Sequence, residues 1–248
     1  MILRAVCVMV LLLATAQASA AALTVSAASS LTESFRAVAS AYEQAFPDTK
    51  VDLNFAASGM LLQQISRGAP VDVFASADLR SMEQAEQQGL LLPGSRHVFA
   101  RNTLWVVVPP GAGTPPRRLQ DLGAAGVRRL ALGNPASVPA GRYAQQALQQ
   151  AGLWTSLEGR MIRTQNVRQS LDYVARGEVD AGFVYATDAQ AVATRVDRAF
   201  EVPVAGGIAY PLAALRDSRQ HAEAQRFIGF VRSPQGQAIL RRHGFSAP

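Results

Sequence analysis

The sequence contains very little cysteine and histidine. Its one cysteine, Cys7, lies in an apolar segment at the start of the chain, and its three histidines are His97, His221 and His243. Zinc–thiolate sites, iron–sulfur clusters and disulfide frameworks need several cysteines, and the histidines show no spacing typical of metal ligands. We therefore expect no disulfide and no metal centre built from side chains, and we expect the histidines to lie at the surface.

The sequence also lacks the Gly-x-Ser-x-Gly motif that presents the nucleophile of many secreted hydrolases. The acidic residues Glu178 and Asp180 flank the predicted start of a strand, where a solvated turn is the ordinary interpretation. We therefore expect that the protein is not an enzyme. A secreted hydrolase that uses Glu178, Asp180 or a histidine is kept as an alternative hypothesis.

Lysine is nearly absent: of the 24 lysine and arginine residues, only Lys50 is a lysine. The formal net charge is +6. The arginines stand in separated pairs, such as Arg117–Arg118 and Arg241–Arg242, without interleaved aromatic residues. This pattern does not indicate nucleic-acid binding, and we expect no such partner. A mild positive field would favour encounter with a small anion.

Long apolar runs are missing as well, and the one near the N-terminus, Val6 to Ala18, is too short to cross a membrane. This segment has the layout of an export signal, with Arg4 before the apolar stretch and the small residues Ala18-Ser19-Ala20 at its end. We therefore predict export, with residues 1–20 as a signal peptide that is cleaved near Ala20. Cleavage would also remove the one cysteine.

What the sequence does contain is the composition of a globular protein, with 248 residues, 49% hydrophobic and 17% charged, long enough for one or two domains. Strands are predicted at Leu23–Ala27, Val51–Phe55 and Val71–Ala75, and helices at Leu31–Phe46 and Leu61–Ile65. This βαβαβ order predicts a parallel sheet.

The same alternation returns later in the chain and predicts a second lobe. Strands are predicted at Leu104–Val108, Leu130–Leu132 and Ala181–Tyr185, with helices at Gly141–Ala151 and Val167–Ala175. The predicted fold class is α/β, with two doubly wound lobes joined by a hinge of two crossovers beneath a cleft. The predicted lobes are residues 21–101 with 212–248, and residues 102–211.

Turn-rich segments support two crossings between the lobes. Proline and glycine are concentrated in residues 109–116, and Gly206–Gly207 precede a predicted strand at Tyr210–Leu215. The segment from His221 to Arg242 predicts one or two helices that pack back on the first lobe, the last of them beginning at Pro234.

Four predicted helices begin directly after strands or loops, two in each lobe. Ser30 is followed by Glu33, a capping box that predicts Ser30 as an N-cap, and Ser58 is predicted as the N-cap of the next helix. In the second lobe, Pro139 suits a first helical turn that includes Ala140.

A fourth helix start repeats this pattern, because Asn166 and Gln169 form a cap that places Val167 in the first turn. The first amides of a helix have no acceptor within the helix, and the helix dipole adds a partial positive charge there. Helix starts that converge at the carboxyl ends of strands therefore predict a site for a small oxyanion.

Several short segments at and around these helix starts occur together in the chain. They are Ala27–Thr32, Phe55–Ser58, Gly68–Asp78, Val138–Ala144, Asn166–Arg168 and Gly182–Asp188. In this combination the sequence resembles the periplasmic molybdate-binding proteins, the substrate-binding subunits of molybdate ABC transporters within the type II periplasmic binding proteins. The resemblance covers nearly all of the chain after the predicted signal.

The resemblance implies a ligand and its contacts. Ser30 and Ser58 match two serines that offer both a backbone amide and a hydroxyl to the oxyanion from the first lobe. Ala140 and Val167 match second-lobe positions that donate backbone amides, and Tyr185 matches a tyrosine whose hydroxyl reaches the ligand. Molybdenum would then enter only within the oxyanion, with no direct metal ligand from the protein and no cofactor.

The resemblance also implies a periplasmic location, tungstate as a competing ligand, a monomeric protein, and an ABC permease in the inner membrane as the partner that accepts the loaded form. The chain departs from many relatives where Ala57 and Gly59 flank a lone Ser58, and where Asn134 stands in place of an aspartate. A binder of another small oxyanion, sulfate or phosphate, on the same fold is the main alternative, because a sequence does not give the radius of a cavity.

Overall fold

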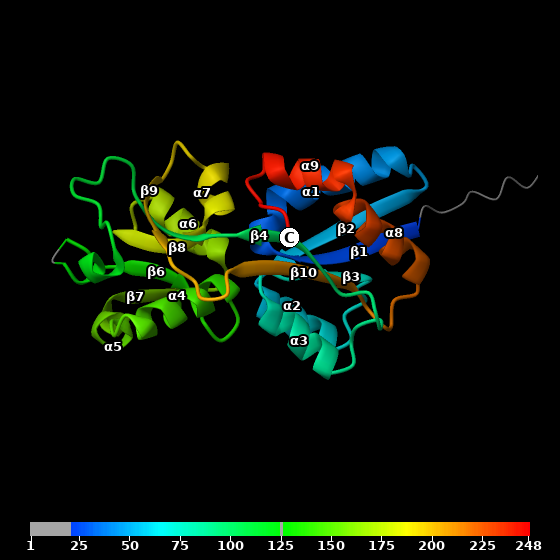
Figure 1. Cartoon of the computed structure of the whole chain (residues 1–248), viewed down its shortest axis with the longest axis horizontal. Coiled ribbons are helices and arrows are strands. Elements are labelled where there is room, and N and C mark those ends of the chain that lie inside the picture. The colour runs from blue at the N-terminus through cyan, green and yellow to red at the C-terminus, as the bar shows by residue number, and fades with distance from the viewer. Residues whose placement is uncertain (1–20, 125) are drawn as a thin grey trace, which may run out of the picture.

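The computed structural model describes residues 21–124 and 126–248. The predicted export signal and its cleavage site lie outside these residues. Within the described ranges, no helix is both long enough and apolar enough to cross a membrane. The described residues form two five-stranded sheets, each covered by helices on both faces (Figure 1). The predicted fold class, an α/β protein of two lobes, is confirmed.

The first lobe is built on the sheet with strand order β2-β1-β3-β10-β4. Its first three strands are parallel, as predicted, whereas β10 runs antiparallel to both of its neighbours. Helices α1, α8 and α9 cover one face, and α2 and α3 cover the other (Figure 1). The strands are β1 (Ala21–Ala28), β2 (Thr49–Ala56), β3 (Val73–Ala75), β4 (His97–Asn102) and β10 (Ile208–Ala214), and the helices are α1 (Thr32–Ala45), α2 (Ser58–Ser66), α3 (Leu79–Gln87), α8 (His221–Arg232) and α9 (Pro234–Arg242).

The second lobe is built on the sheet with order β7-β6-β8-β5-β9, in which β6, β7 and β8 are parallel and β5 is antiparallel to both neighbours. Helices α6 and α7 cover one face, and α4 and α5 cover the other (Figure 1). The strands are β5 (Leu104–Val108), β6 (Leu130–Gly133), β7 (Met161–Thr164), β8 (Ala181–Tyr185) and β9 (Asp197–Val202), and the helices are α4 (Pro139–Gln150), α5 (Trp154–Leu157), α6 (Val167–Ala175) and α7 (Ala186–Ala191).

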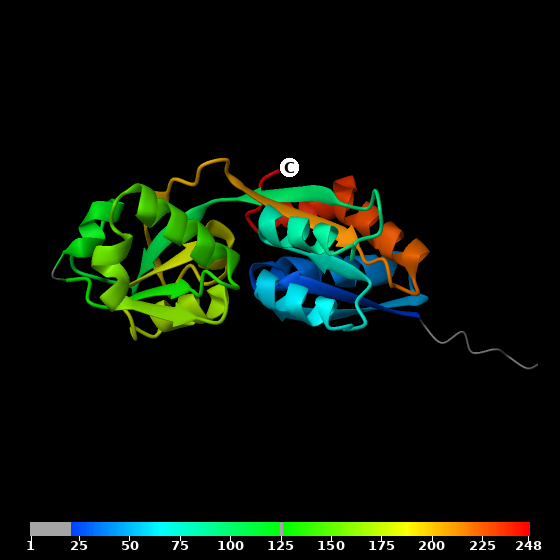
Figure 2. The ribbon, with the colours of Figure 1, turned by 90° about the horizontal axis from the view of Figure 1, so that it is seen from below.

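The chain passes between the sheets twice, and Figure 2 shows both connections on the same side of the molecule. On the way out, Thr103 alone separates β4 from β5, and on the way back residues 203–207 link β9 to β10. Residues 102 and 208–211, which the sequence assigns to the second lobe, pair in the first sheet. The reason is that β10 begins at Ile208, directly after the turn at Gly206–Gly207.

The core of the first lobe follows the periodicity of its first helix. Phe35, Val38 and Tyr42 of α1 are fully buried, and Phe35 and Tyr42 pack edge-to-face against Phe227 of α8 with ring centroids 6.3 and 5.2 Å apart. Each buried side chain of this size stabilises the fold by about 1.5–3 kcal/mol. The C-terminal helices therefore pack back on the first lobe, and α9 begins at Pro234 as predicted.

Candidate anion-binding site

A small cavity lies where helix starts of the two lobes meet. It holds about 180 Å³ of empty space, which is less than the roughly 300 Å³ or more of pockets that bind larger organic ligands. The five residues predicted from the sequence to bind the ligand all line it. The first lobe contributes Ala28, Ser29, Ser30, Ala57, Ser58 and Ala77, and the second lobe contributes Val138, Pro139, Ala140, Val167 and Tyr185.

Ser30 does not cap α1, so the predicted capping box with Glu33 is wrong. Ser30 lies in a 3-10 turn, η1 (Ser29–Leu31), that precedes α1, and the N-cap of α1 is Leu31 without a side-chain hydrogen bond. Both members of the predicted box have distant partners instead. The hydroxyl of Ser30 contacts Tyr210, and the carboxylate of Glu33 pairs with Arg168 of the second lobe. Tertiary contacts have overridden the local pattern.

Ser58 is the first residue of α2, so its prediction as the N-cap is also wrong. The N-cap is Ala57, and no side chain caps this helix. The side-chain oxygen of Ser58 accepts a hydrogen bond of 3.0 Å from the backbone N–H of Ala77. The hydroxyl hydrogen of Ser58 remains able to donate toward the cavity, whereas the N–H groups of Gly59 and Met60 already donate to the carbonyl oxygens of Ser137 and Ala57.

In the second lobe, α4 begins at Pro139 as predicted, with no side-chain cap. The helix start lies close to the end of β6, because a Cβ added to Gly141 would lie 1.8 Å from the carbonyl oxygen of Gly133. Only glycine allows this approach, which places Ala140 at the cavity.

The start of α6 is capped as the sequence predicts, because the Asn166 side chain accepts a 3.0 Å hydrogen bond from the backbone N–H of Gln169. This cap satisfies the third amide of the helix. Val167, the first residue of α6, lines the cavity with its side chain buried.

Tyr185 ends β8 at the cavity, and it is 1% exposed. Its hydroxyl is buried and has no hydrogen-bond partner within residues 21–124 and 126–248. Burial raises the pKa of Tyr185 well above its ordinary value, so the group is a neutral hydroxyl that can donate. A buried hydroxyl without a partner costs about 1–3 kcal/mol, which a ligand that accepts its hydrogen would offset.

Two arginines lie near the cavity, and both are engaged by carboxylates. Arg142 of α4 donates to Asp78 of the first lobe through Nε at 2.9 Å and Nη2 at 2.6 Å. Asp78 also caps α3 by accepting from the backbone N–H of Ser81 at 3.1 Å.

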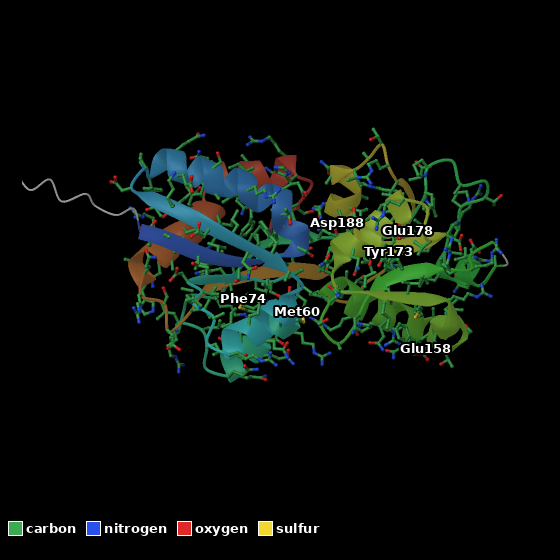
Figure 3. All side chains as sticks on the ribbon, turned by 180° about the vertical axis from the view of Figure 1, so that it is seen from behind. Met60, Phe74, Glu158, Tyr173, Glu178 and Asp188 are labelled. Carbon is green, nitrogen blue, oxygen red and sulfur yellow. The ribbon has the colours of Figure 1, made fainter. Side chains whose placement is uncertain are left out.

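Arg168 of α6 pairs with Glu33 across the lobes and, through Nε at 2.8 Å, with Asp188 of α7. Asp188 is fully buried, and burial raises its pKa to about 6 although the Arg168 guanidinium acts in the opposite direction. Figure 3 shows Asp188 and Met60 of α2 on the two sides of the boundary between the lobes. These arginines neutralise carboxylates at the boundary, which leaves the cavity with neutral donors.

Glu178 and Asp180, the acidic residues of the hydrolase alternative, do not line this cavity. Glu178 forms a surface ion pair with Arg176. Asp180 accepts from the backbone N–H groups of Arg128 and Arg129 at 2.8 and 2.7 Å, which is a turn-stabilising role. Their placement gives no support to that alternative.

Comparison with known proteins covers both lobes. A family model described as bacterial extracellular solute-binding protein matches residues 23–246. The chain is 32% identical to the molybdate-binding protein ModA of Escherichia coli (strain K12), over 90% of this chain and 88% of that protein. It is also 32% identical to a putative ABC transporter substrate-binding lipoprotein, YvgL, of Bacillus subtilis (strain 168), over 91% of this chain and 86% of that protein.

Among solved structures, the periplasmic molybdate-binding protein of Azotobacter vinelandii matches the fold with a TM-score of 0.82 at 27% identity, covering 91% of this chain and 99% of that chain. The similarity therefore extends over the whole two-lobed architecture and includes every segment that contributes to the cavity.

Proposed function

The chain belongs to the bacterial extracellular solute-binding proteins, and from this premise we propose that it binds molybdate, with tungstate as a near-isosteric competitor, in the cavity between its lobes. The observation that carries the proposal is the buried hydroxyl of Tyr185, which has no partner in the described part of the chain, at a cavity lined by helix starts of both lobes. The relatives named as molybdate-binding proteins support the choice of anion. Solute binding is a transport function that needs no catalytic group.

In this proposal the anion is held by neutral donors. Ser30 and Ser58 offer hydroxyls and backbone amides from the first lobe, Ala140 and Val167 offer backbone amides, and Tyr185 offers its hydroxyl. Helix starts favour a negative charge because their amides and dipoles point toward it. A dianion bound between the lobes would draw them together about the two connections, as hinge closure does in binding proteins.

A site made only of donors also selects against protonated anions. Phosphate near neutral pH carries a proton on part of its population, and that proton would face a group that is itself donating. Sulfate carries no proton, so the size of the cavity must exclude it. Because η1, α2 and α4 present backbone to the cavity, its dimensions are set by packed helix starts and not by flexible side chains.

The family description and the relatives support a location outside the cytoplasm. We propose that the mature chain begins after Ala20, that it acts as a monomer, and that the two lobes close on each other, with residues 102 and 208–211 moving with the first sheet, in which they pair. Its proposed partner is the permease of an ABC transporter, which would accept the closed, loaded form.

Thermal unfolding in the presence of anions tests the proposal. The exported protein, purified and dialysed, is titrated with molybdate, tungstate, sulfate and phosphate. A ligand at about 100 times its Kd adds about 2.7 kcal/mol of stability, which raises Tm by several degrees. We expect a shift with molybdate and tungstate alone. An equal shift with sulfate or phosphate would favour the alternative of another oxyanion, and no shift with any anion would refute oxyanion binding.

A substitution at Tyr185 tests the site. Tyr185→Phe keeps the buried ring and removes the hydroxyl, so it should weaken molybdate binding by about 1–3 kcal/mol, a factor of roughly 5 to 150 in Kd. Isothermal titration calorimetry measures the change. The ligand-free variant should unfold at or above the wild-type Tm, because it loses a buried hydroxyl without a partner. An unchanged Kd would remove Tyr185 from the site.

A further inference from the structure

A second buried tyrosine, Tyr210 of β10, contacts the proposed site through Ser30. Its hydroxyl oxygen lies 3.0 Å from Ser30 Oγ, and its ring packs against the Tyr185 ring at 5.7 Å between centroids. Tyr210 is fully buried, and Ser30 is 3% exposed. Either hydroxyl is able to donate in this pair, and the direction decides whether Ser30 keeps its hydrogen for the cavity or presents only lone pairs there.

Asn102, at the end of β4, determines that direction. Its Oδ1 accepts a 2.9 Å hydrogen bond from the backbone N–H of Thr103, which identifies the other atom as Nδ2. An amide nitrogen only donates. Nδ2 lies 2.9 Å from Thr187 Oγ1 and 3.4 Å from the hydroxyl oxygen of Tyr210. The Tyr210 oxygen therefore faces a donor, which leaves its own hydrogen for Ser30.

The reverse direction is disfavoured. It would place two donors, Ser30 and Asn102, on the oxygen of Tyr210 and leave the Tyr210 hydrogen buried without an acceptor among the residues that the structure describes. Burial raises the pKa of Tyr210 well above its ordinary value, so that hydrogen stays on the oxygen at any working pH. A buried donor without an acceptor is costly.

Ser58 shows the same arrangement with a backbone donor. Its oxygen accepts from the N–H of Ala77, and a backbone N–H has no other role in a hydrogen bond. Both cavity serines thus have an oxygen that accepts from the protein behind them, and a hydrogen directed elsewhere.

We propose that Tyr210 and Asn102 are positioning residues that commit Ser30 to donate its hydrogen toward the cavity, an inference that rests on the proposed function of the cavity as an oxyanion site. The chain of hydrogen bonds runs from Asn102 to Tyr210, from Tyr210 to Ser30, and from Ser30 to the anion. A fully deprotonated anion such as molybdate gains a donor at this point. Hydrogen phosphate would bring its own proton against that hydrogen, so the same chain contributes to specificity.

A double-mutant cycle tests the positioning role. Molybdate Kd is measured by calorimetry for the wild type, Tyr210→Phe, Ser30→Ala and the double variant. Ser30→Ala keeps the backbone amide, so binding stays measurable. We expect Tyr210→Phe to raise Kd about 10-fold in the wild-type background, but less than about 2-fold in the Ser30→Ala background, because it acts through the Ser30 hydroxyl. Equal effects in the two backgrounds would overturn the inference.

The specificity readout separates this role from a structural one. In Tyr210→Phe the Ser30 hydroxyl is free to rotate and accept, so we expect the ratio of phosphate Kd to molybdate Kd to fall at least about 5-fold. Tyr185→Phe removes a donor without creating an acceptor, so it should leave that ratio unchanged. Tyr42→Phe is the matched control, because Tyr42 is a fully buried tyrosine that hydrogen-bonds Glu223 within the first lobe.

The outcomes also separate this inference from the proposed function. A wild type that does not bind molybdate overturns both. A wild type that binds molybdate, together with a Tyr210→Phe variant that keeps the phosphate-to-molybdate ratio of the wild type, overturns the inference alone.

Discussion

Gly59 offers a way to separate the closure of the lobes from the stability of the fold. It is the second residue of α2, and its N–H donates a 2.9 Å hydrogen bond to the carbonyl oxygen of Ser137 in the second lobe. A Cβ added at this position would lie 2.7 Å from that oxygen and 2.8 Å from Ser137 Cα. Both atoms are backbone, so no side-chain rotation relieves the overlap, and Gly59→Ala must hold the lobes slightly apart.

The size of the effect follows from these contacts. Overpacking against rigid backbone costs about 1–3 kcal/mol, and stretching the hydrogen bond costs up to about 1 kcal/mol more. We therefore expect Gly59→Ala to weaken the binding free energy of molybdate by about 2 kcal/mol, which raises the Kd roughly 30-fold. The ligand-free protein should respond differently, because lobes that are apart do not meet the added methyl group, and alanine stabilises a helix by about 0.5–1 kcal/mol over glycine.

The assay is calorimetry with molybdate together with thermal unfolding of the ligand-free protein. The expected pattern is weaker binding with an equal or higher Tm. Gly229→Ala is the matched control, because Gly229 lies within α8 and a Cβ there meets nothing within 4 Å. The control should gain the same helix stability and keep the wild-type Kd. Wild-type affinity in Gly59→Ala would refute the reasoning that the lobes must come together at Gly59 and Ser137 when the anion binds.

Two further predictions concern the charges at the boundary. Because the pKa of Asp188 is raised to about 6, the folded protein binds this proton more tightly than the unfolded chain. The free energy of unfolding should therefore fall by up to about 3 kcal/mol as pH rises from about 4 to 6. Denaturant titrations across this range should show that fall in the wild type and not in Asp188→Asn, and parallel pH profiles would contradict it. Glu33→Gln removes a partner of Arg168 across the lobes. Because the side chains of Glu33 and Arg168 are 41% and 20% exposed, solvent weakens their interaction, and the molybdate Kd should rise only about 2- to 4-fold at low salt. In 1 M NaCl the Kd of the variant should equal that of the wild type. Glu43→Gln is the control on the same helix, and it should leave the molybdate Kd unchanged because its partner Lys50 lies in the same lobe. A loss of affinity in Glu33→Gln that persists in high salt would rule out an electrostatic cause.

Most of the fold is encoded in local patterns that the sequence displays. The apolar stripe of α1 and the cap at Asn166 were predictable because each depends on residues within one or two helical turns. The short elements were not. Strand β9, with the sequence Asp-Arg-Ala-Phe-Glu-Val, lies at a sheet edge and has no regular alternation of polar and apolar residues, and α7 spans only six residues. Neither has enough periodicity to stand out from a loop.

The type of site and the residues that line it were predictable from the sequence, but the hydrogen-bond and ion-pair partners of those residues were not. Helix starts alone indicate an oxyanion site, and the resemblance to molybdate-binding proteins identifies which five residues to consider. The capping roles of Ser30 and Glu33 were assigned wrongly because their partners, Tyr210 and Arg168, lie 180 and 135 residues away in the chain. A capping pattern carries no information about side chains that arrive from another lobe.

The proposed use of helix-start amides at Ala140 and Val167 would have an evolutionary consequence. Every residue type except proline carries the same N–H, so substitution at these two positions changes the wall of the cavity but leaves the proposed donor in place. The preference for an anion would then depend on the path of the backbone. Homologues with different side chains at these two positions could therefore still bind the same anion. Redirecting such a protein to a different anion would require moving a helix start, because exchanging a single side chain leaves these donors where they are.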